Sequence, residues 1–304
     1  MLRELRNLPA PAKLNLFLHV TGRRNDGYHL LETVFQFIDL ADSLDLCLRD
    51  DGVVRRIGPP DEIAPELDLT LRAAAALKTA TGCRLGVDIG LRKLIPIGAG
   101  LGGGSSDAAT VLLGLNKLWR LGLKRRDLIE VARPLGADVP VFVFGRNAYA
   151  TGIGDRLQPI DLPHRWFVLV TPPVSVATPG VFNDPKLTRN TKPITILGFS
   201  EQASPLAGRN DLQPVVMTRQ PAVKAALDAL QESVGALDTA EGHGATEAEA
   251  GNVRMTGSGA CVFAAMQSLQ KAQEVALRVL RHNVGRAQVV EGLAKHPLGS
   301  RQVG

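Results

Sequence analysis

A dense run of glycines is the feature of this sequence that most restricts what the chain can form. Five glycines lie between Gly98 and Gly104, within the segment PIGAGLGGGSSDAAT at 96–110. Glycine adopts positive φ readily and lets other groups approach the backbone closely. The preceding segment RLGVDIGLRKLIP alternates like a strand, and the following segment SDAATVLLGLNKLWRLG has helical periodicity. The order strand, glycine loop, helix brings free amides and the positive end of a helix dipole to one place, which favours phosphate binding.

Other patterns also place a glycine-rich loop before a helix. The Walker A pattern ends in Gly-Lys-Ser/Thr, but two serines and no lysine follow Gly104, so that pattern fails. The dinucleotide-binding pattern G-x-G-x-x-G fits Gly98–Gly103 literally, although the later strand with a ribose-binding carboxylate is not apparent. A purely structural turn with a helix N-cap at Ser106 or Asp107 is a third interpretation, but a cap requires only one glycine.

The first half of the chain reads as strands and helices. Alternating leucines at 14–18 predict a strand whose other face carries Lys13 and Asn15. Residues 30–48 are expected to be further β structure. Residues 67–82 predict a helix that ends at a glycine C-cap.

After about residue 160 the character of the sequence changes, and we expect an α+β second half with its own core. The predicted elements are a strand at 165–173, a helix at 221–235, two strands around a glycine turn at 252–266, a helix at 268–282 and a strand at 285–293. The small, acidic segment 235–251 is predicted to be a surface loop. We therefore expect two domains, 1–160 and 161–304.

Composition limits the class of protein. With 45% apolar and 21% charged residues, the chain suits a soluble globular protein, and prolines interrupt its charge-free stretch at 166–183. Three separated cysteines predict a reducing compartment, and no signal peptide is apparent, so we expect a cytoplasmic protein. The net charge is +5, but the basic residues are scattered, which argues against nucleic acid and suits a small anionic substrate.

A series of motifs, taken together, carries a family resemblance. The segment PIGAGLGGGSSDAA closely resembles the ATP-binding motif of the GHMP kinase superfamily. Further segments resemble, nearly end to end, the branch that phosphorylates a cytidyl diphosphate sugar alcohol in non-mevalonate isoprenoid biosynthesis. These segments are PAKLNLFL at 11–18, GYH at 27–29, TVFQFIDLAD at 33–42, LGADVPVF at 135–142, TPGVF at 178–182, RNDLQP at 209–214 and MTGSGACVF at 255–263.

The resemblance implies an α+β, two-domain GHMP kinase fold, with a ribosomal-protein-S5-like N-terminal domain and a ferredoxin-like C-terminal domain. It implies ATP and Mg²⁺ as cofactors, and transfer of a phosphoryl group to the 2-hydroxyl of the sugar alcohol. We expect a monomer or a weak homodimer, with neither nucleic acid nor membrane as partner. A homoserine or mevalonate kinase is the alternative within the superfamily, against which DGYH and TPGVF argue. A dinucleotide-binding oxidoreductase and a noncatalytic relative are the alternatives outside that activity.

The resemblance also implies the residues that hold ATP. Lys93 matches a nucleotide-contacting lysine, with a solvated strand end as its structural alternative. The loop residues implied with it are Pro96, Ile97, Gly98, Ala99, Gly100, Leu101, Gly102, Gly103, Gly104, Ser105 and Ser106. Where the family usually has Asn-Leu, this chain has Asp68 and Leu69, so an adenine contact from the asparagine is in doubt, although Asp68 could accept from the adenine amino group.

Two residues match the catalytic pair of the family. Asp138 in GADVP would accept the proton of the substrate hydroxyl, and Lys13 would polarise that hydroxyl or the γ-phosphate. From the residues alone, the favoured interpretations are structural: Asp138 as an N-cap before Pro140, and Lys13 as an exposed strand lysine. Retention of both residues argues against a noncatalytic relative.

The substrate-binding residues implied by the resemblance surround a cytosine. They are Asn15, Tyr28, His29, Phe35, Thr178 and Phe182. Stacking and edge hydrogen bonds suit a pyrimidine, although Phe35 and Phe182 could each be core residues. The second glycine turn, Gly257–Gly259, could place amides near a diphosphate or simply tighten a hairpin.

Overall fold

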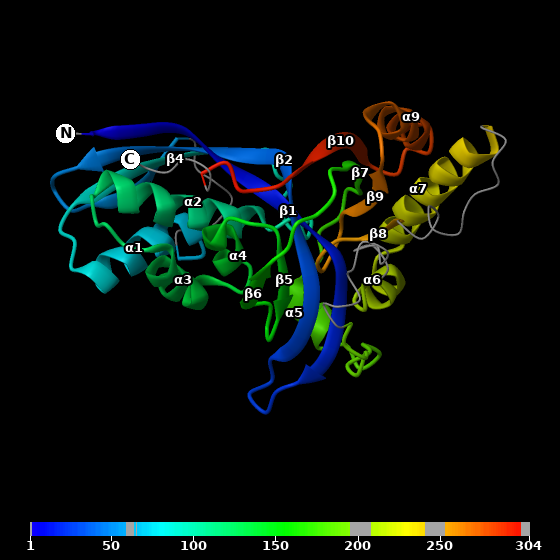
Figure 1. The fold of residues 1–304 in the computed structure, drawn as a ribbon, viewed down its shortest axis with the longest axis horizontal. Helices are drawn as coiled ribbons and strands as arrows, with labels where there is room; N and C mark the ends of the chain where they lie inside the picture. Colours follow the sequence, from blue (N-terminus) through cyan, green and yellow to red (C-terminus); the bar gives the residue numbers. More distant parts are fainter. Residues whose placement is uncertain (1, 59–63, 65, 195–207, 241–252, 299–304) are drawn as a thin grey trace.

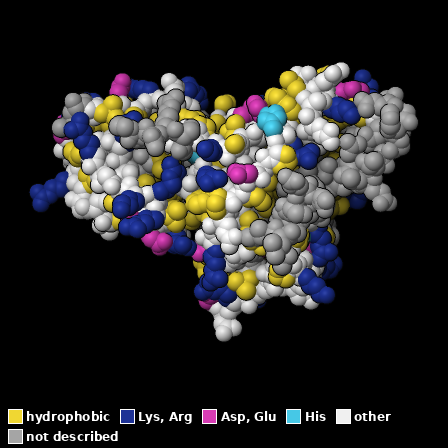
Figure 2. All heavy atoms as spheres, in the orientation of Figure 1, with side chains coloured by type: hydrophobic (Ala, Val, Ile, Leu, Met, Phe, Trp, Pro, Cys, Tyr) yellow, Lys and Arg dark blue, Asp and Glu magenta, His cyan; other side chains and the backbone are white. Residues whose placement is uncertain are grey.

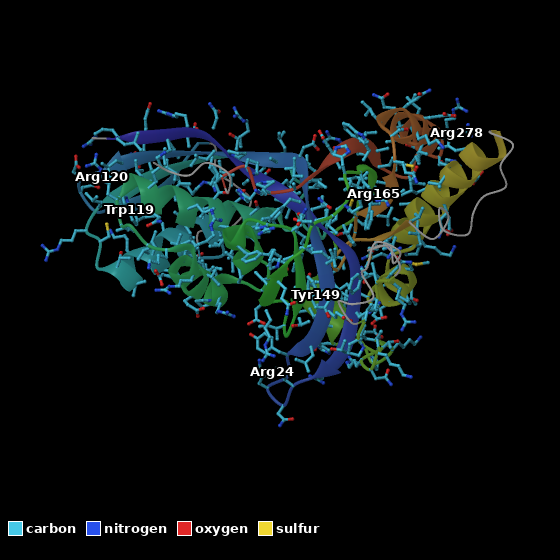
Figure 3. All side chains as sticks on the ribbon, viewed as in Figure 1. Arg24, Trp119, Arg120, Tyr149, Arg165 and Arg278 are labelled. Carbon is cyan, nitrogen blue, oxygen red and sulfur yellow. The ribbon has the colours of Figure 1, made fainter. Side chains whose placement is uncertain are left out.

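Two long antiparallel strands run through the computed structural model, which describes residues 2–58, 64, 66–194, 208–240 and 253–298 (Figure 1). Strand β1 (Glu4–Arg23) pairs with β2 (His29–Arg49) over almost its whole length, with shifts of register that include one between Pro11 and Lys13. The tip of this hairpin, where Arg24 is labelled in Figure 3, projects away from the rest of the chain. The leucine alternation at 14–18 therefore predicted the strand correctly but only part of its length.

Strand β2 is long enough to pair with several other strands. It lies antiparallel to β4 (Gly86–Arg92), which is parallel to β3 (Val54–Ile57), and to β5 (Ala148–Thr151), which pairs with β6 (Arg156–Pro159). Strand β10 (Arg286–Leu293) pairs with both β2 and β7 (Trp166–Thr171). From β7 the sheet continues through β9 (Val262–Met266) to β8 (Val253–Met255). A single sheet thus links the two halves of the chain.

Helices of the first half cover one face of the long strands (Figure 1). They are α1 (Leu69–Thr81), α2 (Gly103–Leu118), α3 (Arg125–Ala132), the 3₁₀ turn η1 (Arg133–Leu135) and α4 (Val139–Phe144). Helix α1 begins at Asp68, whose side chain accepts from Thr70 N, and ends at Gly82 with φ of 66°. Leu112 and Leu115 of α2 are fully buried with Leu46 of β2 in one core cluster. Each such leucine contributes roughly 1.5–3 kcal/mol to folding.

The second half builds its own core on β7, β8 and β9. Its helices are α5 (Thr178–Phe182), α6 (Gln213–Arg219), α7 (Pro221–Ala240) and α9 (Leu269–Leu280). Leu230 of α7 and Val275 of α9 are buried with Val168 and Val262 of the sheet in a second cluster. Figure 1 shows α6, α7 and α9 on the opposite side of the molecule from α1.

The structure confirms most of the predicted elements and corrects two of them. Helix α2 begins at Gly103, before the predicted Ser106, because the glycine loop ends one turn earlier. The predicted surface loop at 235–251 is wrong for residues 235–240, which continue α7, since Leu237 is 6% exposed and packs into the second core cluster. The remainder of that segment lies outside the described residues. The boundary at residue 160 stays a prediction.

Two further observations concern the surface and the cysteines. Within the described ranges, no helix combines the length and apolar character needed to cross a membrane. Cys47, Cys83 and Cys261 are all free thiols. Figure 2 shows basic side chains at several separate places on one face of the molecule, not in a continuous stripe.

Candidate active site

A cavity of about 710 Å³ is lined by residues from both halves of the chain. The first two strands contribute Lys13, Asn15 and Thr33, while α5 and the turn after β8 contribute Phe182 and Ser258. The glycine loop forms another part of its wall, and Figure 1 shows α2, the long strands and α5 converging in the middle of the molecule. The volume of this cavity lies in the range typical of small-molecule sites.

The glycine loop requires its glycines. Gly98, Gly100 and Gly102 have φ of +69°, +75° and +73°, which side-chain-bearing residues rarely adopt. A Cβ on Gly100 would lie 2.3 Å from the carbonyl oxygen of Thr256, and one on Gly102 would lie 3.1 Å from Cε of Lys13. The loop therefore packs tightly against the second half of the chain and against the lysine, and two of its glycines are needed for these close approaches.

Helix α2 directs its N-terminus at the cavity. Its N-cap is Gly102, which has no side chain to cap the first amides, and Ser106 N already donates to Gly102 O at 2.9 Å. The interpretation of Ser106 or Asp107 as the N-cap is therefore wrong, because both lie inside the helix. Uncapped amides at a helix start are available to an anion such as phosphate. All the predicted ATP-binding residues line the cavity except Ser106, which is fully buried.

Lys93 is a partly buried ion-pair partner at the edge of the cavity. Its Nζ lies 2.5 Å from Oδ2 of Asp42 and 2.7 Å from Oδ2 of Asp107, and its side chain is 25% exposed. Burial lowers the pKa of Lys93, but attraction to Asp107 and Asp42 outweighs burial and raises it above the ordinary value. Burial raises the pKa of Asp107 to about 7, against the opposing effect of Lys93. The interpretation of Lys93 as a solvated strand end is wrong; its contact with a nucleotide stays a prediction.

Lys13 and Asp138 meet at the base of the cavity. Nζ of Lys13 lies 3.2 Å from Oδ2 of Asp138 and donates to Oδ1 of Asn15 at 2.5 Å and to the carbonyl oxygen of Gly100 at 3.0 Å. An ammonium group has three donors, so these three partners orient it completely. Lys13 is 2% exposed and is therefore not an exposed strand lysine. Asp138 occupies the N-cap position of α4 before Pro140, as the residues alone indicated, but its side chain makes no cap hydrogen bond and pairs with Lys13 instead.

Asn15 and Thr33 support this lysine. Nδ2 of Asn15 donates to Oγ1 of Thr33 at 2.9 Å, and that hydroxyl donates to the carbonyl oxygen of Phe17. The backbone N–H of Asn15 donates to Oγ1 of Thr256 from the second half of the chain, at 2.9 Å. The prediction that Lys13 and Asn15 share one face is confirmed by their direct hydrogen bond.

The predicted cytosine-binding residues are only partly brought together. Phe35, Thr178 and Phe182 line the cavity, and Oγ1 of Thr178 lies 2.6 Å from Oγ of Ser258. The His29 ring lies 5.1 Å from that of Phe182 but does not line the cavity. Tyr28 is 61% exposed and lies outside the cavity lining.

Two of these residues also have structural roles. Phe35 is 2% exposed and belongs to the first core cluster, and Lys13 Nζ lies 5.6 Å from its ring centroid. Phe182 packs against the second core cluster while still lining the cavity. The second glycine turn reaches the cavity too, because Gly257 and Ser258 line it.

Asp68 also lines the cavity, but its carboxylate is already engaged. Oδ1 accepts from Thr70 N at 2.7 Å and from Thr70 Oγ1 at 2.6 Å, and Oδ2 accepts from Arg56 at 3.1 Å. Asp68 therefore serves as the N-cap of α1 and as the partner of Arg56. An additional contact with an adenine amino group stays a prediction.

Sequence reasoning missed several residues around the cavity. Asp42 accepts from the backbone N–H groups of Leu94 and Ile95, as well as from Lys93, and so anchors the start of the glycine loop. Arg56 and Thr33 were also missed. The aspartate at the end of TVFQFIDLAD was the one available signal for Asp42, whereas Arg56 stands in a polar edge strand without any recognisable pattern.

The described part of the chain holds no cluster of three or more histidine, cysteine or acidic side chains suited to a metal ion. Mg²⁺, however, is usually bound by one or two protein oxygens together with substrate phosphates. Oγ of Ser106 and Oδ1 of Asp107 are buried without a hydrogen-bond partner among the described residues, next to the glycine loop. These residues fit a metal ion that arrives with a nucleotide.

Comparison with known proteins decides the family. Residues 68–146 match the family "GHMP kinases N terminal domain", and residues 199–285 match "GHMP kinases C terminal". The 4-diphosphocytidyl-2-C-methyl-D-erythritol kinase of Cupriavidus metallidurans is 47% identical over 298 residues, which are 98% of this chain and 96% of that relative. The chain belongs to the 4-diphosphocytidyl-2-C-methyl-D-erythritol kinases of the GHMP kinase family. It shares the two-domain, mixed α/β fold of that family and is an ATP-dependent kinase.

Further relatives agree with membership of these erythritol kinases. The enzyme of the same name from Burkholderia pseudomallei is 49% identical over 302 residues, covering 97% of each chain. A crystal structure of 4-(cytidine 5'-diphospho)-2C-methyl-D-erythritol kinase superposes with a TM-score of 0.74 at 34% identity, covering 95% of this chain and 98% of that one. A homoserine kinase from Cytophaga hutchinsonii superposes with a TM-score of 0.69 at 16% identity, covering 97% and 96%, which shows a shared fold.

The oxidoreductase interpretation does not fit this GHMP kinase. In a dinucleotide-binding unit, the glycine loop and its helix lead to a parallel strand beside the first. Here α2 leads through α3 and α4 to β5, which pairs antiparallel with β2. Within the described ranges, no parallel strand follows α2, so the match to G-x-G-x-x-G is accidental.

Proposed function

We propose that this chain transfers the γ-phosphoryl group of ATP to the 2-hydroxyl of 4-diphosphocytidyl-2-C-methyl-D-erythritol, a step of non-mevalonate isoprenoid biosynthesis. The observation that carries the chemistry is the ion pair between Lys13 and Asp138, which lies in a cavity shared with the glycine loop. The named substrate is supported by relatives that are 47% and 49% identical over nearly the whole chain.

The reaction requires a proton acceptor beside the hydroxyl. Asp138 accepts the hydroxyl proton as the oxygen attacks the γ-phosphorus, and the bond between that phosphorus and the β,γ-bridging oxygen breaks to release ADP. Asp138 suits this role because its side chain is 34% exposed, whereas its partner Lys13 is buried. Lys13 is held by three hydrogen-bond partners, so its charge is already in place when negative charge develops on the transferring oxygens.

The nucleotide is held by the glycine loop and the start of α2. Its phosphates lie on Gly98–Ser106 and contact the backbone amides of this segment that precede Ser106, because Ser106 N already donates to Gly102 O. Mg²⁺ bound with the nucleotide neutralises charge on the phosphate oxygens. Ser106 and Asp107 would hold this ion, because each has a buried oxygen without a partner among the described residues.

The cytidine end of the substrate is placed beside α5. Phe182 and Thr178 of α5 line this part of the cavity, and the ring of His29 lies 5.1 Å from that of Phe182. A pyrimidine stacked on Phe182 would separate the base from the reacting hydroxyl by the length of the diphosphate. We also propose a cytoplasmic location and a monomer or weak homodimer, in keeping with three free cysteines and a small-molecule substrate.

A coupled assay of ADP release tests this function. The purified chain is given ATP and Mg²⁺ with the cytidyl diphosphate substrate, homoserine or mevalonate in parallel reactions. We expect kcat/KM for the cytidyl substrate to exceed the other two by at least about a hundredfold, because only that substrate fills the Phe182 end. Comparable turnover of homoserine or mevalonate would contradict the proposal.

A further inference from the structure

An irregularity in the first strand commits the hydroxyl proton of Thr33. The β1–β2 ladder pairs Leu18 with Thr33, and its register shifts between Asn15 and Leu18. Oγ1 of Thr33 donates to the carbonyl oxygen of Phe17, which lies within this irregular stretch, and the Thr33 side chain is buried. A hydroxyl group has one proton, so Oγ1 can only accept a hydrogen bond from any further partner.

This hydroxyl sets the direction of the Asn15 amide. Nδ2 of Asn15 donates to Oγ1 of Thr33 at 2.9 Å, and Oδ1 of Asn15 accepts from Nζ of Lys13 at 2.5 Å. In the reversed direction, the amide would set its oxygen against a hydroxyl with no proton to give, and its NH2 group against an ammonium group. Because Asn15 and Thr33 are both buried, groups left unpaired in this way would carry the full cost of desolvation. Thr33 therefore makes Oδ1 the end of the amide that faces Lys13.

Asn15 holds Lys13 independently of the groups that take part in the reaction. The other two acceptors of the ammonium group are the carbonyl oxygen of Gly100 and Oδ2 of Asp138. During phosphoryl transfer Gly100 lies against the phosphates, and the charge of Asp138 is neutralised by the proton that it accepts. The Asn15 amide stays the same throughout. A charge that must be in place before the reaction starts requires such an unchanging partner.

We propose that Thr33 is a positioning residue, which acts through the direction of the Asn15 amide to hold the Lys13 ammonium group in place for phosphoryl transfer. The proposal rests on the proposed function, in which Lys13 stabilises the charge that develops on the transferring oxygens. Thr33 lines the cavity, but in this role it acts on the amide and not on ATP or the sugar alcohol. Loss of its hydroxyl should therefore lower kcat and leave the affinity for ATP nearly unchanged.

Thr33→Val and Thr33→Ser separate the hydroxyl from the shape of the side chain. Valine keeps the volume and removes the hydroxyl, whereas serine keeps the hydroxyl and removes a methyl group. We expect kcat of Thr33→Val to fall about tenfold or more while its ATP affinity, measured by calorimetry, stays within about twofold. Thr33→Ser should keep kcat within about threefold of the unmodified chain.

Thr110→Val is the matched control for loss of a buried threonine hydroxyl. Thr110 is 0% exposed in α2, its Oγ1 lies 3.5 Å from the carbonyl oxygen of Pro9, and it does not line the cavity. Its kcat should stay unchanged. A loss in Thr33→Ser as large as that in Thr33→Val overturns the proposal, because the hydroxyl would then not be the group that matters.

The path through Asn15 is tested by repeating the substitution in Asn15→Leu, which has no amide to direct. Asn15→Leu should itself lower kcat. Adding Thr33→Val should lower it by less than about a further twofold, since the two residues act as one unit. A further loss as large as that of Thr33→Val alone overturns the proposal and leaves Thr33 as a support for the first strand.

The hold on Lys13 can also be measured without turnover. The full chain is labelled with ¹⁵N-lysine, and the Lys13 ammonium signal is assigned by its loss in Lys13→Met. An ammonium group with three acceptors in a buried site exchanges its protons with water slowly, so this exchange should become at least about tenfold faster in Thr33→Val, but not in Thr110→Val. Unchanged exchange in Thr33→Val overturns the proposal.

Failure of this proposal can be distinguished from failure of the proposed function. If the unmodified chain does not phosphorylate the cytidyl substrate, the proposed function is contradicted, while the exchange measurement still decides whether Thr33 holds Lys13. If Thr33→Val does not fold, Thr33→Cys replaces it, because a thiol is a weak donor and a weak acceptor. Its kcat should fall at least about threefold with ATP affinity retained, and an unchanged kcat overturns the proposal.

Discussion

Nζ of Lys13 lies 3.2 Å from Oδ2 of Asp138, although one residue stands in the first strand and the other directly before α4. The contact exists because the sheet carries Lys13 beneath the glycine loop, where its backbone N–H also donates to the carbonyl oxygen of Leu101 at 3.0 Å. A buried cation and a partly exposed carboxylate thus meet beside a phosphate-binding loop.

Asp138→Asn tests proton transfer. The substitution keeps the shape of the side chain but removes its basicity, so kcat should fall roughly 10²- to 10⁴-fold while KM for the cytidyl substrate changes little. Steady-state kinetics measures both constants. Asp161→Asn is the control, because Asp161 pairs with Arg146 on the surface and its side chain is 99% exposed. A fall in kcat of less than about tenfold would show that positioning, not base catalysis, carries the step.

Gly102→Val tests the phosphate cradle. The new Cβ would meet Cε of Lys13 and the ring of Phe142 at 3.1 Å, at a backbone φ of +73°. We expect ATP affinity, measured by calorimetry, to fall at least about tenfold, because the loop must shift away from the phosphates. Gly122→Val is the matched control: its φ is +66° and nothing lies within 4 Å of its added Cβ. That variant should lose stability from backbone strain and keep its ATP affinity; equal ATP affinities in both variants would place the phosphates elsewhere.

Phe182→Ala tests the cytidine end. Loss of a stacking ring costs roughly 1–3 kcal/mol, so kcat/KM for the cytidyl substrate should fall about tenfold to a hundredfold with little change in ATP affinity. Part of the loss should appear in kcat, since binding energy far from the reacting hydroxyl helps to hold it in place. Leu187→Ala is the control, because Leu187 is buried in the same core cluster without lining the cavity. A fall in ATP affinity as large as that in kcat/KM would make Phe182 a core residue only.

The local elements of this fold could be predicted because they depend on periodicity and on single residues. Helix α1 illustrates this, since its apolar spacing and Gly82 define its extent, and the structure places Gly82 at its C-cap. The return of β10 to pair with β2 could not be predicted in the same way, because nothing within 285–293 indicates which strand it joins. Pairing between distant strands depends on the whole core.

In the site, too, local placement could be predicted from the sequence, whereas contacts between distant segments could not. The strand pattern placed Lys13 and Asn15 on one face, but only the resemblance brought Asp138 to them. The contacts of Asp42 with Lys93, and of Arg189 with His29, join segments that the sequence separates widely. Both arginine and aspartate are common on surfaces, so their burial and partners become visible only in the folded chain.

His296 gives a prediction for stability against pH. It is 0% exposed, its Nδ1 accepts from Leu298 N at 3.1 Å, and burial, with a smaller effect of Arg125, lowers its pKa to about 3. In the unfolded chain, His296 takes up a proton near its ordinary pKa of 6.5. Between pH 6.5 and about pH 3, the unfolded state therefore binds more protons than the folded state. The free energy of unfolding should therefore fall as pH falls through this window, by on the order of 1–2 kcal/mol between 6.5 and about pH 5.

Denaturant unfolding of the unmodified chain and of His296→Gln at several pH values measures this effect. The glutamine keeps an acceptor for Leu298 N but does not titrate, so its unfolding free energy should fall less over the same range. Parallel pH dependences in the two proteins would show that other groups, among them His19 and His29, account for the loss.

Phosphorus NMR of the product tests the central claim most directly, because it identifies the oxygen that receives the phosphoryl group. The carbon that carries the 2-hydroxyl also carries the methyl branch and has no hydrogen. Incubation with ATP, Mg²⁺ and the cytidyl diphosphate substrate should therefore yield ADP and one new phosphomonoester signal that stays a singlet without proton decoupling. A doublet or triplet, from a phosphate on a carbon that bears hydrogen, or the absence of any new phosphomonoester, would contradict the account.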